Sequence, residues 1–155
     1  MNPTRRQTLQ AAGGTGLMAA LAAFGLSVPV TARAQGVAGA FQAKSVSDAL
    51  KGLGAAAPAE SKDVVINSPD IAENGAVVPV AIKSNIPKTE SIMLLVDKNP
   101  QPLAGAYDVL AGMEPEVSSR IKMGQSSDVI ALVKADGKYY MAKKEIKITL
   151  GGCGG

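Results

Sequence analysis

Two stretches of the sequence are apolar on both faces of the strand that each predicts. Residues 91–96 read SIMLLV and residues 129–133 read VIALV, so neither strand has a charged side chain to turn toward water. Side chains alternate between the two faces of a strand, and both faces of each therefore need cover. We expect a helix or a second sheet to supply it. The alternative is a partner chain on the side of Met93 and Leu95, because an exposed apolar patch usually marks an interaction surface.

Shorter alternating stretches fill the chain from Lys62 onward, and turn signals such as Asn74-Gly75 and Asp136-Gly137 separate them. The predicted strands are residues 63–67, 76–83, 90–97, 106–110, 117–123, 127–135, 138–144 and 145–150, of which the last two can form one bent strand. Short strands at such intervals predict a mainly β protein, an immunoglobulin-like antiparallel β-sandwich. Pro79 has no N–H to donate and is expected on an edge strand or at a bulge.

One short amphipathic helix is expected before the strands. Apolar residues recur at helical spacing in residues 46–53. Ser45 or Ser47 can cap the start of this helix, and Gly52 or Gly54 can end it.

The first 34 residues have the features of an export signal. Adjacent Arg5 and Arg6 precede a weakly hydrophobic run over about residues 11–30, and Ala32-Arg33-Ala34 offers a cleavage site. The pattern resembles a twin-arginine signal peptide, which would place the folded protein in a bacterial periplasm with Gln35 at its start. An ordinary Sec leader is the alternative, because Thr8 stands where the twin-arginine pattern usually has Phe after the arginine pair.

The chain ends in Gly151-Gly152-Cys153-Gly154-Gly155, and Cys153 is its only cysteine. Four glycines argue against a fixed core position, so we expect a flexible arm. An unpaired cysteine in an exported protein suggests an intermolecular bond or a reactive thiol. The expected organisation is a signal peptide (1–34), a helix with its connector (35–61), a β-sandwich (62–150) and an arm (151–155).

The composition excludes several kinds of chemistry. The chain has no histidine, which rules out a catalytic Ser–His or Cys–His pair and a histidine-ligated metal. Without the three leader arginines, its 16 basic residues fall to 13 and equal its 13 acidic ones, and aromatic residues make up only 3%. This balance argues against nucleic-acid binding. We expect no catalytic residue, metal site or resident cofactor, so Cys153 depends on other proteins for activation.

Four features together resemble the SoxY family of bacterial sulfur-substrate carriers. They are the glycine-flanked Cys153, the segment Ser68–Val80 (SPDIAENGAVVPV), the segment Asn99–Ala104 (NPQPLA) and the twin-arginine leader. The resemblance covers essentially the whole chain. It implies a non-catalytic periplasmic protein that holds a thiosulfate-derived sulfur adduct on Cys153. Its carrier arm would be formed by Gly151, Gly152, Gly154 and Gly155.

The resemblance also implies a set of partners. SoxZ would form a heterodimer with the chain, and the doubly apolar strands would be a candidate surface for it. In that case, introducing a charged side chain at Met93 or Leu95 should abolish copurification with SoxZ. SoxXA would conjugate thiosulfate to the cysteine and SoxB would release sulfate. Where present, SoxCD would oxidise the remaining persulfide sulfur.

Two other functions compete with a carrier that uses its cysteine. One is an exported interaction module whose cysteine forms an intermolecular disulfide or an attachment. The other is a ubiquitin-like carrier activated at its terminal carboxylate, which fits poorly because that activation needs cytoplasmic ATP chemistry. We expect no membrane anchor. A transmembrane anchor is the weaker option because the hydrophobic run is interrupted by glycines and ends in a processing site, and bacterial lipoproteins are modified on a cysteine at the leader cut rather than at the far end.

Overall fold

The computed structural model describes residues 30–149. The predicted signal residues Arg5 and Arg6 lie outside this range, and so does the predicted arm, residues 151–155. The compact unit considered below begins at Ala34, the last residue of the predicted signal peptide.

Two helices precede nine strands within the described residues. The helices are α3 (Val30–Gln42) and α4 (Val46–Gly52). The strands are β1 (Ala59–Glu60), β2 (Val64–Asn67), β3 (Ile71–Ala72), β4 (Val78–Ser84), β5 (Thr89–Val96), β6 (Leu103–Asp108), β7 (Glu116–Ile121), β8 (Ser127–Ala135) and β9 (Lys138–Ile148).

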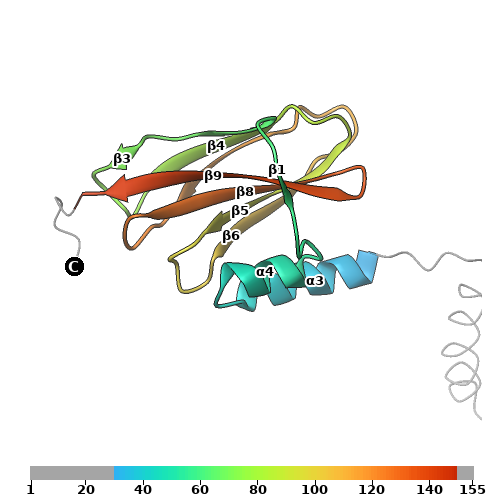
Figure 1. Cartoon of the computed structure of the whole chain (residues 1–155), viewed down its shortest axis with the longest axis horizontal. Helices are drawn as coiled ribbons and strands as arrows, with labels where there is room; N and C mark the ends of the chain where they lie inside the picture. Colours follow the sequence, from blue (N-terminus) through green and yellow to red (C-terminus); the bar gives the residue numbers. More distant parts are fainter. Residues whose placement is uncertain (1–29, 150–155) are drawn as a thin grey trace, which may run out of the picture. The chain divides into compact units, whose positions relative to one another are not determined.

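The strands form two sheets, and these are the two layers of a sandwich (Figure 1). The larger sheet has the order β1-β9-β8-β5-β6, with β3 also paired to β9; the smaller has the order β2-β4-β7. The long strands pair antiparallel, whereas the two-residue strands β1 and β3 run parallel to β9. The prediction of a mainly β, immunoglobulin-like sandwich is confirmed.

The main core lies between the two sheets. One face of β5 and β8, represented by Leu94 and Val133, packs against the inner face of β4, represented by Val80 and Ile82. All four side chains are at most 2% exposed. Burying a side chain of this size contributes about 1.5–3 kcal/mol, so this layer dominates the stability of the sandwich.

The helices cover the opposite face of the larger sheet. Met93 and Leu95 are 4% and 0% exposed, and they form a second core with Ala40 of α3 and Ala49 of α4. Figure 1 shows α3 and α4 beside the sheet that contains β5 and β6. The chain therefore covers both faces of its apolar strands by itself, and the hypothesis of a partner surface at Met93 and Leu95 is wrong.

The prediction of a single helix is also wrong, because α3 precedes α4. The two helices approach closely through residues without large side chains. A Cβ on Gly36 would lie 2.7 Å from the carbonyl oxygen of Gly52. A Cβ on Gly52 would lie 3.5 Å from the Cβ of Ala40. The predicted cleavage site at Ala34 falls within α3, so residues 35–42 of this helix would remain after processing.

The ends of α4 agree with the sequence signals. The Ser45 side chain accepts a hydrogen bond from the N–H of Asp48 at 3.1 Å and caps the helix. At the other end, Gly54 has a φ of +75°, and the N–H of Ala55 donates to the carbonyl of Leu50 at 2.8 Å. Glycine adopts this left-handed conformation without strain, which allows the helix to stop there.

The strand predictions differ from the structure mainly at the ends of strands. β8 has the predicted bounds, and β9 is one strand rather than two. β6 begins three residues earlier than predicted, and β1 and β3 were not predicted. Pro79 lies on the central strand of the smaller sheet, but β2 pairs with β4 only as far as Ala81, so β7 alone pairs at the proline. The expected edge environment is thus present locally.

The helical cover over Leu95 gives a test by mutation. We expect Leu95→Ala to lower the free energy of unfolding by about 2–5 kcal/mol, because truncating a buried leucine leaves a cavity. The matched control is Val65→Ala on β2, where the side chain is 43% exposed; its effect should stay under about 1 kcal/mol. Denaturant unfolding of both variants measures the difference. Equal stability of Leu95→Ala and the wild type would mean that this face is not covered by the helices.

Candidate functional site

The last strand carries the chain toward Cys153. β9 ends at Ile148, and Thr149 is the last described residue. Cys153 follows Thr149 by four residues and lies outside the described range, as do Gly151, Gly152, Gly154 and Gly155. Their roles stay predictions. The described part of the site is the strand end, Lys147 to Thr149, which we call the arm root.

One side of the arm root is held by β3. The N–H of Lys147 donates to the carbonyl of Asp70 at 2.9 Å, and the N–H of Thr149 donates to the carbonyl of Ala72 at 3.1 Å. These bonds extend the parallel pairing in which Ala72 lies beside Ile148. β3 belongs to the segment 68–80 on which the family resemblance rests, and the structure places that segment directly against the arm root.

The other side of the arm root is held by a side chain. The N–H of Ile148 donates to Oγ of Ser126 at 2.9 Å. The backbone pairing of β8 with β9 begins only at Ser127 and Ile146, so no β8 residue lies opposite Ile148. The hydroxyl of Ser126 therefore replaces the missing backbone acceptor.

A close contact between two loops lies beside Ile148. The N–H of Met123 donates to the carbonyl of Gly75 at 2.7 Å. A Cβ on Gly75 would lie 2.3 Å from the carbonyl oxygen of Met123 and 3.3 Å from Cγ2 of Ile148. This position thus requires glycine for space rather than for backbone conformation.

A lysine on β9 fastens the segment that leads into β3. Nζ of Lys144 donates to the carbonyl of Ser68 at 2.6 Å and lies 3.0 Å from a carboxylate oxygen of Asp70. The Asp70 side chain is 86% exposed, so the ion pair contributes at most about 1 kcal/mol. The hydrogen bond to the backbone carbonyl is the part that fixes the position of the segment.

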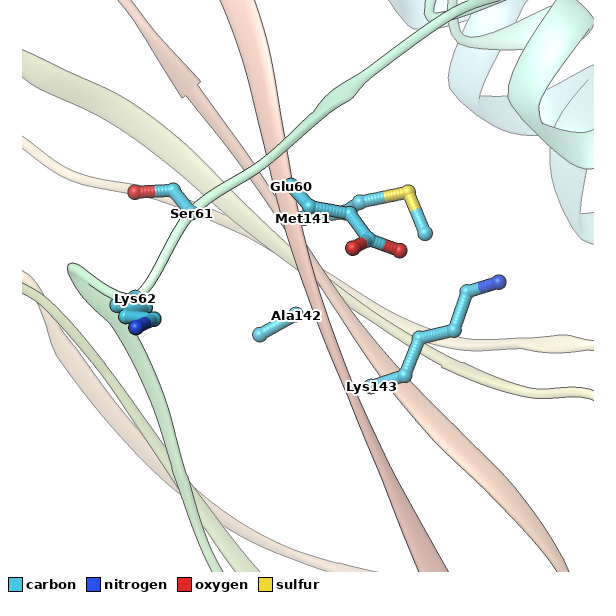
Figure 2. Close-up of a pocket in the computed structure, with 6 residues that line it drawn as sticks. All are labelled: Glu60, Ser61, Lys62, Met141, Ala142 and Lys143. Atoms are coloured by element: carbon cyan, nitrogen blue, oxygen red, sulfur yellow. The ribbon is translucent and has the colours of Figure 1, made fainter.

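Two surface hollows lie away from the arm root. One, of about 320 Å³, opens where β1 leaves the edge of β9 and is lined by Glu60, Ser61, Lys62, Met141, Ala142 and Lys143 (Figure 2). The other, of about 340 Å³, is lined by Pro79, Ser118, Ser119 and Arg120. Neither contains a histidine or a cysteine, so neither offers a nucleophile with a histidine base.

Among residues 30–149, no group of three or more His, Cys, Asp or Glu side chains is placed to hold a metal ion. Within the same range, no helix is long and apolar enough to cross a membrane. The polar contacts found at the strand end are hydrogen bonds and surface ion pairs. The arrangement described here can hold the end of β9 in place.

Comparison with known proteins gives the family. The model of the family described as sulfur oxidation protein SoxY matches residues 50–153, a range that includes both the β-sandwich and Cys153. The chain belongs to the SoxY family. A solved structure of the sulfur carrier protein SoxY from Chlorobium limicola f thiosulfatophilum is 38% identical, with a TM-score of 0.62 over 68% of this chain and 96% of that one.

A weaker structural similarity lies outside the family. A superoxide reductase (neelaredoxin) from Ignicoccus hospitalis is 19% identical, with a TM-score of 0.49 over 56% of this chain and 79% of that one. Such a similarity says nothing about function. No matching sequence was found among the curated proteins.

Sequence reasoning placed the cysteine but did not identify the residues that hold its strand. Ser126 is separated from Ile148 by 22 positions, and no local pattern links them. Ala72 lies in the two-residue strand β3, and Asp70 comes directly before it. A segment this short shows no periodicity. The only signal was the inclusion of these two residues in the family-like segment 68–80.

The space at Gly75 provides a second test. Gly75→Ala should lower the free energy of unfolding by about 1–3 kcal/mol, because the added methyl group forces the two loops apart. Gly124→Ala is the matched control at the same end of the sandwich, since a Cβ there has no atom within 4 Å; its effect should stay within about 0.5 kcal/mol. Thermal unfolding of the two variants compares them. Equal melting temperatures would contradict the close contact.

Proposed function

We propose that the chain is a periplasmic sulfur-substrate carrier that holds thiosulfate-derived sulfur covalently on Cys153 and presents it to the enzymes of thiosulfate oxidation. One observation carries the proposal: the family match extends to residue 153, which is the only cysteine in the chain. The structure of the described residues supports it, because the strand that leads to this cysteine is held on both sides up to Thr149.

The absence of histidine supports a carrier rather than an enzyme. A cysteine becomes strongly nucleophilic beside a base, a cation or a helix N-terminus, and the residues that flank Cys153 in the sequence are glycines. Fully extended, four residues span at most about 14 Å, so a visiting enzyme can receive Cys153 within that distance of Thr149. The enzyme then supplies the activating groups.

The carrier cycle can be written with balanced chemistry. Oxidative conjugation joins the outer sulfur of thiosulfate to Sγ of Cys153 as Cys–S–S–SO₃⁻; the thiol loses a proton and two electrons pass to the oxidising enzyme, the role of SoxXA. Water then cleaves the outer S–S bond, which releases sulfate and leaves the persulfide Cys–S–SH, the role of SoxB. SoxCD, where present, would oxidise the persulfide sulfur.

Export and the heterodimer belong to the same proposal. The leader of residues 1–34, with Arg5, Arg6 and Ala34, supports export by the twin-arginine route, and the compact unit that begins at Ala34 is compatible with cleavage there. SoxZ is the proposed stable partner. Its surface is not formed by Met93 and Leu95, which the helices cover.

Mass spectrometry of the protein isolated from thiosulfate-grown cells tests the carrier role. We expect the intact mass to show a chain that starts at Gln35 and carries an adduct on Cys153 that reductant removes. Cys153→Ser should fold normally, carry no adduct and abolish thiosulfate-dependent growth.

Two outcomes would contradict the proposal. A homodimeric disulfide as the only modification would favour an exported interaction module. Full growth of the Cys153→Ser strain would favour a carrier that uses its terminal carboxylate.

A further inference from the structure

Every backbone N–H of the arm root has a partner. Lys147 and Thr149 donate to carbonyls of the β3 segment, and Ile148 donates to the hydroxyl of Ser126. Successive N–H groups of a strand point to opposite edges, so partners on both edges are needed to hold three residues in a row. The β3 side has two backbone acceptors, while the β8 side has one side chain.

Ser126 extends the larger sheet beyond the point where β8 begins. The register of β8 with β9 begins at Ser127 and Ile146, and Ile148 lies two residues further along β9. Ile148 is half-buried and packs against the main core, where an unpaired N–H is costly. The serine hydroxyl satisfies it at 2.9 Å.

The position of the last fixed residue determines the reach of the cysteine. With the arm root held, Thr149 is the last fixed residue, and Cys153, four residues later, can lie at most about 14 Å away. If the arm root detached, the last fixed residue would be Ile146, whose side chain is fully buried. Cys153 would then follow by seven residues and could reach about 25 Å. The effective concentration of a tethered group falls roughly as the −3/2 power of tether length, here by about two-fold.

We propose that Ser126 is a positioning residue for Cys153: its hydroxyl keeps the arm root on the sheet, so that the cysteine is presented from Thr149 at a limited reach. The inference rests on the proposed carrier role, because a defined reach matters only if other proteins act on Cys153. Ser126 itself touches no substrate.

The first experiment measures the arm root directly in the mature chain. In Ser126→Ala, the amides of Ile148 and Thr149 should exchange with solvent about five-fold faster by NMR, the equivalent of one side-chain hydrogen bond. Ser126→Thr keeps the hydroxyl and should restore the wild-type rate. Ser118→Ala, at an exposed serine on β7, is the control. Unchanged amides of Ala131 and Leu132 in β8 would show that the fold is retained.

The second experiment measures reach. A spin label on Cys153 and another on a cysteine at exposed Lys51 of α4 give a distance distribution, which Ser126→Ala should broaden and Ser126→Thr should restore. The proposal is overturned if Ser126→Ala leaves the amide exchange rates or the distance distribution at their wild-type values. A failure of Ser126→Thr to restore them also overturns it.

The third experiment separates this inference from the carrier role. Reaction of Cys153 with a small aromatic disulfide reagent should be equal in all variants, while enzymatic conjugation of thiosulfate by SoxXA should fall by up to about two-fold in Ser126→Ala. Unchanged conjugation together with faster exchange would overturn the positioning role and leave the carrier role intact. Absence of conjugation in the wild type would refute the carrier role, and the exchange and distance measurements would still decide whether Ser126 fixes the arm root.

Discussion

Burial of β5 and β8 on both faces is the constraint on which the rest of the structure depends. These strands lie side by side in the middle of the larger sheet, and their apolar side chains point in both directions. One face is covered by the smaller sheet and the other by the helices. Layers are needed on both sides because an uncovered face of this size would be an interaction surface. The N-terminal helices are therefore part of the core rather than an appendage of the leader.

The position of β9 follows from this core. It pairs with β8 on one edge, and two-residue strands cover parts of its other edge at residues 140–141 and 147–148. Its inner residues, such as Ile146, belong to the main core, while the outer ones, such as Lys143 and Lys147, are exposed. The strand thus combines a buried face, which fixes it against the core, with an exposed outer face.

The sequence predicted best where a long apolar stretch ended at a clear turn signal. β8 was predicted with correct bounds because the apolar run of residues 129–133 is followed closely by the Asp136-Gly137 turn. β1 and β3 have two residues each, too few for a period, and α3 is rich in glycine and alanine and overlaps the leader. A helix or a second sheet was the expected cover over Met93 and Leu95, and the helices supply it. The covering residues themselves could not be predicted, because small side chains such as Ala40 and Ala49 give little sign of packing on a sheet. The role of Cys153 is a prediction from composition, whereas the Ser126 contact depends on tertiary structure.

Under the carrier role, the two parts of the chain need opposite properties. The glycines around the cysteine have no side chains that a narrow enzyme channel would exclude. For the same reason, they offer the enzyme no side chain to recognise. Discrimination between carriers must then come from the surface that an enzyme meets within the reach of Cys153, which is the surface around Thr149. Ile71 of β3 lies there, beside Lys147, with its side chain 57% exposed. Under that role, a fixed arm root keeps the cysteine within about 14 Å of that surface, so that docking on the sandwich would limit where the sulfur can arrive.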